Sequence, residues 1–176
     1  MTCQDYTAHR GRLAPLLPCM FEIIAENMRE IAPTGNSLEQ DRALWHSTMR
    51  RELRRPDKHW VLAFSGETLA GYTLYRISGR VLHMDEIQVA KPFQGGGEAF
   101  PLLMGHMLHQ AQAGGVRTVR ASANKVNRKS QGILSAMGLK AVGETARSLR
   151  YQGDAQDALD WFRQITENNT AGEEQA

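Results

Sequence analysis

The sequence of 176 residues lacks the features that would assign it at once to a membrane or a secreted class. No apolar run approaches the roughly 20 residues that a bilayer-spanning helix needs. The N-terminal segment MTCQDYTAHRGR has no apolar stretch after a basic one, as a secretory signal would have. From these two absences we expect a cytoplasmic protein with no membrane partner.

Cysteine is scarce, and neither sign of charge is in large excess. The two cysteines, Cys3 and Cys19, form neither a CxxC pair nor a metal-binding spacing. We therefore expect two reduced thiols, with Cys19 buried, and no metal site. The net charge of only +2 gives no argument for binding to nucleic acid.

One short segment is nevertheless strongly basic. The run RRELRRPDK, residues 50–58, holds four arginines and one lysine. It fits the solvated C-terminal end of a helix, where cations interact favourably with the helix dipole. A surface that recruits an anionic acceptor or partner is the alternative, and the sequence leaves both interpretations open.

The order of the hydrophobic patterns predicts one α/β domain over residues 1–165, followed by a disordered tail over 166–176. Ser37 should begin one helix in a capping box with Gln40, because a serine and a glutamine at this spacing can satisfy each other's amide groups. The predicted strands are 59–64, 68–77, 81–90, 117–123, 139–145 and 147–152, after a short first strand near 3–10. The predicted helices are 13–31, the one capped by Ser37, one that follows the glycine run, 127–137 and 154–165.

The connection between two of these strands sets the predicted topology. Residues 117–123 are reached from 81–90 through a helix, so the two strands should pair in parallel. The remaining strands follow one another through short turns and should be antiparallel. We therefore expect a mixed sheet with helices on both faces.

Three consecutive glycines, Gly95 to Gly97, lie between the strand at 81–90 and the next helix. Glycines cost backbone entropy, so they are expected either to turn the chain or to let a ligand approach the backbone closely. A helix N-terminus offers unpaired N–H groups and the positive end of a dipole, which suits a phosphate group. The run fits neither the GxxxxGK[ST] loop of P-loop NTPases nor the GxGxxG dinucleotide fingerprint.

The segment QGGGEA, residues 94–99, resembles the Q/R-x-x-G-x-G/A signature of the GCN5-related N-acetyltransferase (GNAT) family. Gln94, Gly97 and Ala99 stand in the signature positions. The preceding IQVAKPF is similar to the family's L-x-V-x-P-x-(Y/F) strand exit, although Pro92 is one place late.

A second motif lies further along the chain. NRKSQGILSAMGL, residues 127–139, resembles the family's N-x-x-A-x-x-L-Y-x-x-x-G-F helix. The likeness spans residues 59–152 and agrees with the predicted order of strands and helices. It implies the GNAT-type acyltransferase fold, an α/β fold built on a central mixed sheet with flanking helices.

The resemblance implies acetyl-CoA, or another acyl-CoA, as the donor substrate. It implies that the pyrophosphate is held by backbone N–H groups in the signature segment Gln94, Gly95, Gly96, Gly97, Glu98 and Ala99. At the strand exit, marked by Ile87 and Val89, the Val89 N–H would meet the thioester carbonyl. Asn127 would lie near the pantetheine, with Ser130 a weaker candidate, although a helix cap explains Asn127 equally well.

Acyl transfer to an amine requires a group that takes up the amine proton. In the family, bases recur four and six residues before the strand-exit valine, which points here to Asp85 and His83. These two residues share one face of the strand and could relay a proton together. Glu86 is the alternative, because a bulge in the strand would change which side chains face the site.

One position departs from the family. The tyrosine that commonly serves as general acid on the second motif helix is replaced by Leu134. Water, or a tyrosine elsewhere such as Tyr72, Tyr75 or Tyr151, could protonate the leaving thiolate.

The activity that these residues indicate is acetyl transfer from acetyl-CoA to a primary amine, by direct attack in a ternary complex. The acceptor could be a small-molecule amine, or a protein N-terminus or lysine. A non-catalytic acyl-CoA-binding or sensor domain is a further alternative, suggested by Leu134. Homodimers are common in the family, but we find no surface patch in the sequence that requires one.

Overall fold

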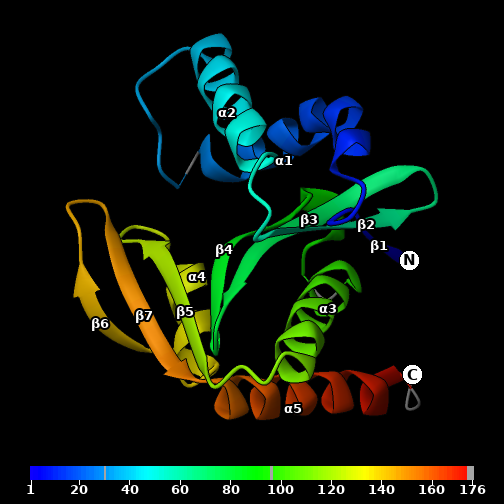
Figure 1. Ribbon diagram of the computed structural model, residues 1–176, viewed down its shortest axis with the longest axis vertical. Helices are drawn as coiled ribbons and strands as arrows, with labels where there is room; N and C mark the ends of the chain where they lie inside the picture. The colour runs from blue at the N-terminus through cyan, green and yellow to red at the C-terminus, as the bar shows by residue number, and fades with distance from the viewer. Residues whose placement is uncertain (30, 96, 174–176) are drawn as a thin grey trace. The chain divides into compact units, whose positions relative to one another are not determined.

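The computed structural model describes residues 1–29, 31–95 and 97–173, with side chains through Glu167 (Figure 1). No helix in these ranges is both long and apolar enough to cross a bilayer. The elements in chain order are β1 (Thr2–Asp5), η1 (Arg10–Leu16), α1 (Leu17–Arg29), α2 (Leu38–Glu52), β2 (Lys58–Ser65), β3 (Thr68–Ser78), β4 (Val81–Val89), η2 (Lys91–Phe93), α3 (Ala99–Ala113), β5 (Thr118–Asn124), α4 (Arg128–Ala136), β6 (Lys140–Glu144), β7 (Ser148–Asp154) and α5 (Ala155–Glu173).

The seven strands form one mixed sheet in the order β1-β2-β3-β4-β5-β7-β6. Thr118–Ala121 of β5 pair in parallel with Val81–Met84 of β4, as the intervening helix predicted. The mixed sheet and its parallel pair are therefore confirmed. The chain forms two compact units, one of residues 1–76 and 85–103 and the other of residues 77–84 and 104–176. The predicted extent of a single domain, residues 1–165, stays a prediction.

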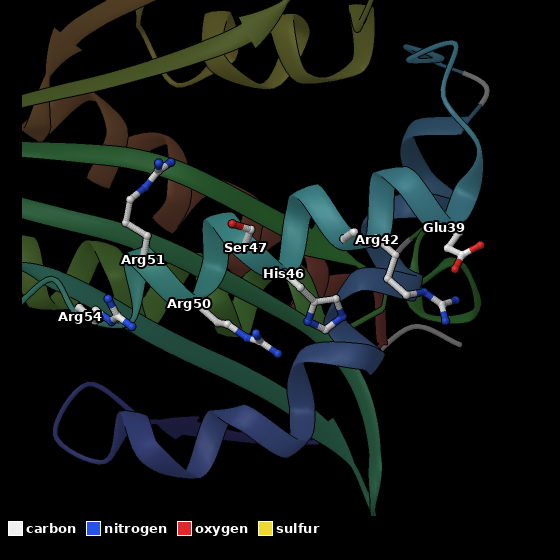
Figure 2. A pocket seen from close by; sticks show the side chains of 8 residues that line it. Glu39, Arg42, His46, Ser47, Arg50, Arg51 and Arg54 are labelled. Atoms are coloured by element: carbon white, nitrogen blue, oxygen red, sulfur yellow. The ribbon is translucent and has the colours of Figure 1, made fainter.

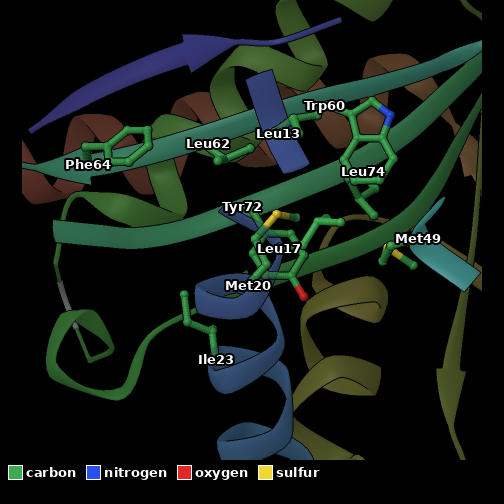
Figure 3. Packing of buried hydrophobic residues seen from close by; sticks show 10 residues of the cluster. All are labelled: Leu13, Leu17, Met20, Ile23, Met49, Trp60, Leu62, Phe64, Tyr72 and Leu74. Atoms are coloured by element: carbon green, nitrogen blue, oxygen red, sulfur yellow. The ribbon is translucent and has the colours of Figure 1, made fainter. Parts of the chain in front are cut away.

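The first unit contains β1, β2, helices α1 and α2, and the C-terminal end of β4. Helix α2 begins at the predicted capping box: the Gln40 amide donates to Ser37 Oγ at 3.2 Å, and the Ser37 amide donates to Gln40 Oε1 at 2.9 Å. The core of this unit contains one cluster of buried side chains drawn from helices and strands (Figure 3). Its members are Leu13, Leu17, Met20, Ile23, Met49, Trp60, Leu62, Phe64, Tyr72 and Leu74.

The second unit contains β5, β7 and β6, most of α3, and helices α4 and α5. All seven residues of β5 pair with β7. Helix α3 packs closely on α5 at a glycine, because a Cβ atom at Gly105 would lie 2.9 Å from Cζ of Phe162. Helix α4 begins at Asn127 and is followed by Gly138, whose φ of +80° suits the residue that ends a helix.

Three expectations about the elements need correction. The helix expected over 13–31 is split, because Pro15 lies in the 3-10 segment η1 and α1 begins only at Leu17. The last helix, expected to end at 165, continues to Glu173, so residues 166–173 are helical; 174–176, the rest of the expected disordered tail, lie outside the described residues. Cys19, expected to be buried, is exposed on α1.

Candidate active site

Three side-chain amides surround the end of β4. The Val89 carbonyl accepts hydrogen bonds from Asn27 Nδ2 at 3.0 Å and from Gln94 Nε2 at 2.8 Å. Gln94 Nε2 also donates to Asn27 Oδ1 at 2.9 Å, and Asn27 Nδ2 donates to Gln88 Oε1 at 2.9 Å. This amide clamp of Asn27, Gln88 and Gln94 ties α1, the end of β4 and the start of the glycine loop to one another.

The backbone of Val89 points away from the neighbouring strand β3. The next amide, of Ala90, donates to the Ala70 carbonyl at 2.9 Å, and polar groups alternate between the two edges of a strand. The Val89 carbonyl lies on the opposite edge, where the amide clamp holds it. The Val89 side chain is 9 % exposed and belongs to the core, as expected.

Gly71 on β3 lets the end of β4 come unusually close. A Cβ atom at this position would lie 2.5 Å from the Gln88 carbonyl oxygen and 3.2 Å from Val89 Cα. Real Cβ atoms essentially never approach a backbone oxygen this closely, so only glycine fits here without moving β4. Gly71 therefore helps to set the position of the strand exit.

The backbone of the glycine loop itself requires glycine at two positions, whether or not a ligand binds. Gly95 has a φ of +83°, a conformation that favours glycine. A Cβ atom at Gly97 would lie 2.7 Å from the carbonyl oxygen of Phe93. Gly96 lies outside the described residues. Any side chain at position 97 would thus disturb the loop itself, with or without a ligand.

The loop and the start of α3 have the properties of an anion site. Helix α3 begins at Ala99, and the Leu102 amide donates to the Glu98 carbonyl at 3.0 Å, so the amides of residues 98–100 lie at the start of the helix, where an α-helix supplies no acceptor of its own. The space beside Gly95 is open, since a Cβ atom there would meet nothing within 4 Å. These features fit a pyrophosphate on bare backbone. The Glu98 carboxylate is 75 % exposed and pairs with the Met1 amino group at 3.2 Å.

Asp85, expected as a catalytic base, is held in an ion-pair network. Lys58 Nζ donates to Asp85 Oδ2 at 2.8 Å, and Arg76 donates to both carboxylate oxygens at 2.9 and 3.1 Å. Lys58 is itself almost fully buried and also pairs with Glu52 at 2.9 Å. Burial acts to raise the pKa of Asp85, but the hydrogen bonds from Arg76 and Lys58 outweigh it and the pKa falls below its usual value. A carboxylate with this pKa and these partners is a weak proton acceptor.

Glu86, the next residue, has the opposite environment. The Tyr72 hydroxyl donates to Glu86 Oε1 at 2.7 Å, and Thr73 Oγ1 donates to the Glu86 carbonyl at 2.9 Å. Burial raises the pKa of Glu86 above its usual value, although hydrogen bonds from Tyr72 and Gln88 act to lower it. Burial also raises the pKa of Tyr72, which therefore stays protonated as the donor of this pair.

His83 lies with the second unit. It is partly buried on β4, where its register partner is Arg120 of β5. A relay between His83 and Asp85 would use a carboxylate whose oxygens already accept three hydrogen bonds from Lys58 and Arg76. The participation of His83 in the reaction stays a prediction.

The residues expected near the pantetheine form the start of α4, also in the second unit. Asn127 Oδ1 accepts a hydrogen bond from the Ser130 amide at 3.0 Å, which is the helix cap that sequence reasoning had left open. Leu134 is 6 % exposed and packs in the core. Of the tyrosines considered as general acids, Tyr72 donates its hydroxyl hydrogen bond to Glu86. The buried Tyr75 hydroxyl has no hydrogen-bond partner among the described residues.

Sequence reasoning missed the roles of four residues in this region. Asn27 gave no signal and Lys58 was noticed only as part of the basic run, because their partners lie 61 and 27 positions away in the chain. Gly71 had a usable signal, since an isolated glycine within a strand often marks a close backbone approach. Tyr72 was considered only as an acid, not as the partner of Glu86.

The mixed sheet, with a glycine loop between a central strand and a helix, is an α/β architecture that this chain shares with acetyltransferase structures. The Acetyltransferase (GNAT) family model matches residues 19–139, and the chain belongs to this family. It is thus an acetyltransferase within the larger class of acyltransferases. A comparison with proteins of curated function found no match.

Solved structures of the family share the fold. The PaiA N-acetyltransferase from Thermoplasma acidophilum, solved in complex with coenzyme A, matches with a TM-score of 0.71 at 14 % identity, over 88 % of this chain and 99 % of that one. The aminoglycoside 6'-acetyltransferase type Ii matches with a TM-score of 0.62 at 12 % identity, over 88 % and 97 %. The ribosomal-protein-alanine N-acetyltransferase from Brucella melitensis matches with a TM-score of 0.55 at 17 % identity, over 88 % and 99 %. At these identities the likeness shows the fold alone.

Proposed function

We propose that the protein transfers an acetyl group from acetyl-CoA to a primary amine by direct attack in a ternary complex. Family membership supports the reaction, and the coenzyme A in the PaiA structure supports the donor. The names of the similar structures include an aminoglycoside and a ribosomal-protein acetyltransferase, so the fold by itself leaves the acceptor open. Acetyl-CoA supplies the acetyl group as an activated thioester.

The donor site that we propose is the glycine loop with the start of α3. The backbone amides of Gly95, Gly97, Glu98 and Ala99 would hold the pyrophosphate, and Gln94 would position the loop through the amide clamp. Gly96, Asn127 and Ser130 stay predicted donor contacts. On the opposite edge of β4 from β3, the Val89 N–H is proposed to stabilise the carbonyl oxygen as negative charge develops on it.

The proton acceptor that we propose is Glu86. A protonated alkyl amine has a pKa near 10.4, so it must lose a proton before its nitrogen can attack. Glu86 takes up this proton. The neutral nitrogen then forms the C–N bond as the C–S bond breaks, the sulfur leaves as the CoA thiolate, and the second proton of the nitrogen passes to the thiolate or to solvent. The raised pKa of Glu86 makes it a better proton acceptor than Asp85 near neutral pH. The observation that carries the assignment is the difference in partners: Lys58 and Arg76 donate three hydrogen bonds to Asp85, whereas Glu86 accepts one from the Tyr72 hydroxyl and has no cationic ion-pair partner among the described residues.

Glu86→Gln tests the assignment, because glutamine can still accept the hydrogen bond from Tyr72 but cannot take up a proton. We expect kcat to fall by about 100-fold or more, with acetyl-CoA affinity unchanged in calorimetry. Asp85→Asn is the matched variant and should keep most of the turnover. Full turnover in Glu86→Gln with a large loss in Asp85→Asn would overturn the assignment and restore Asp85 as the base.

The donor site is tested by changing the charge beside it without touching the glycines. Glu98→Gln removes an exposed negative charge at the start of α3, so acetyl-CoA should bind about two- to fivefold more tightly at low salt, and the gain should shrink at high salt. Glu67→Gln, which removes an exposed charge in the β2–β3 turn, is the control and should bind as the wild type does. Equal affinities for Glu98→Gln and wild type at low salt would argue against a pyrophosphate at this end of α3.

A further inference from the structure

Helix α2 presents an exposed and strongly basic groove in the first unit. The groove has a volume of about 780 Å³ and follows the helix and the residues just after it (Figure 2). We call it the α2 groove. Its lining residues are Glu39, Arg42, Ala43, His46, Ser47, Arg50, Arg51 and Arg54.

The arginines around the groove divide into paired and unpaired ones. Arg42 pairs with Glu22 at 2.6 Å, and Arg55, just beyond the groove, pairs with Asp57 at 2.8 Å. No carboxylate of the described residues pairs with Arg50, Arg51 or Arg54, and all three are exposed. The net positive charge of the groove therefore comes from these three side chains, which outnumber the one carboxylate in the lining, that of Glu39.

The stability of α2 does not require three unpaired arginines at its C-terminal end. One or two cations in the last turn are enough to interact with the helix dipole, and Arg54 lies beyond the C-cap residue Leu53. Like charges four residues apart, as Arg50 and Arg54 are, repel each other and cost stability. Unpaired like charges held together on a surface are better explained by a ligand of opposite charge.

The shape of the groove fits a chain rather than a single ion. At about 100° per residue, Ala43 and Ser47 lie between Arg50 on one side and Arg51 on the other, so short side chains form the floor between long ones. Figure 2 shows Arg50 and Arg51 leaving α2 toward opposite sides. Residues 39–54 span about 20 Å at helical rise, which matches about six residues of extended peptide. Each guanidinium can hold a carboxylate through two parallel hydrogen bonds.

A partly buried ion-pair chain connects the groove end of α2 to Asp85, the neighbour of the candidate base in the sequence. Glu52, in the last turn of α2, pairs with Lys58 at 2.9 Å, and Lys58 pairs with Asp85 at 2.8 Å. Asp85 is the residue before Glu86. The C-terminal end of the α2 groove and the middle of β4 are thus linked through one lysine side chain.

We propose that the acceptor is an acidic polypeptide segment, which lies in the α2 groove and brings its own N-terminus or a lysine to Glu86. This proposal rests on the proposed acetyltransferase function and names its substrate class. The reaction chemistry favours a polypeptide over a nucleic acid, because the acceptor must offer an aliphatic primary amine and nucleic acids have none. The acidic side chains supply the charge that complements Arg50, Arg51 and Arg54.

Two synthetic peptides test the proposal. One has a free N-terminal alanine, a lysine and about six glutamates, and the other has glutamine at every glutamate position. We expect the glutamate peptide to bind about tenfold more tightly at low salt and to be acetylated with a correspondingly higher kcat/KM. The variant R50Q/R51Q/R54Q should lose this preference while keeping its acetyl-CoA affinity. The control R12Q/R80Q/R147Q, which removes three exposed arginines outside the groove, should keep the preference.

The possible outcomes distinguish failure of the acidic-acceptor proposal from failure of the proposed acetyltransferase function. Equal acetylation of the two peptides, or equal loss of preference in both triple variants, would overturn the acidic acceptor and leave the acetyltransferase intact. Binding of the glutamate peptide without acetylation, while a neutral amine is acetylated, would overturn it as well. Tighter binding of a single-stranded oligonucleotide than of the glutamate peptide would assign the groove to nucleic acid. Absence of transfer to any amine would instead contradict the proposed function.

Discussion

At the scale of single residues, Asp85 and Glu86 are neighbours on β4 whose pKa values are shifted in opposite directions. Asp85 is ionised more easily than a free aspartate because Lys58 and Arg76 bind its charged form. Glu86 is ionised less easily because burial disfavours its charge. We expect the first to contribute stability and propose that the second accepts the amine proton, and each environment gives a separate test.

Asp85→Asn should destabilise the protein at neutral pH by about 2 kcal/mol, because the buried Lys58 keeps only Glu52 as a partner. The pKa of Asp85 is lower in the folded state, so its contribution is present above the unfolded pKa near 3.9 and is lost as the pH falls through the lower folded value. Urea unfolding of variant and wild type at pH 7 and pH 3 measures this. A stability difference of the same size at both pH values would contradict it.

Glu86→Gln should show the reverse dependence. The pKa of Glu86 is higher in the folded state, so wild type loses stability as the pH rises from the unfolded pKa near 4.3 through the raised folded pKa. The variant lacks this loss, and its stability relative to wild type should increase over that interval. Urea unfolding at pH 4 and pH 8 checks the sign, and a relative stability that falls with pH would show that Glu86 is not desolvated.

At the scale of elements, the end of β4 depends on a close approach to β3. Gly71→Ala should destabilise the protein by about 2–3 kcal/mol and weaken acetyl-CoA binding, because the added methyl group meets the Gln88 carbonyl and displaces the strand exit. Gly132→Ala is the matched control, since a Cβ atom at this α4 position meets nothing within 4 Å. That variant should gain about 0.5–1 kcal/mol in urea unfolding. Similar small changes in both variants would show that β4 tolerates the methyl group.

The elements themselves were largely predictable, whereas the contacts that arrange the site were not. Hydrophobic periodicity and the Ser37–Gln40 capping box are local, so they indicated strands and helices close to those observed. The amide clamp joins residues 67 positions apart, and no periodicity in the sequence reports such a contact. The proposal of Glu86 rather than Asp85 as the base rests on ion pairs from Lys58 and Arg76 to Asp85, which the sequence does not reveal.

At the scale of the whole molecule, the small net charge conceals a concentrated positive surface. Replacing Arg50, Arg51 and Arg54 with glutamine removes three of the 21 basic residues and changes the net charge from +2 to −1. The thermal midpoint should stay the same or rise, because the change relieves repulsion and breaks no ion pair of the described residues. Scanning calorimetry beside R12Q/R80Q/R147Q checks this. A fall seen only in the groove variant would indicate a structural role for these arginines.

The amide clamp has a consequence for how donor binding can be measured. Asn27, Gln88 and Gln94 carry side chains that do not titrate and bear no net charge. Acid and added salt therefore leave the clamp itself unchanged while they act on the phosphates of the donor and on nearby carboxylates. If acetyl-CoA binds at this loop as proposed, the amide clamp itself should add nothing to the salt and pH dependence of acetyl-CoA affinity.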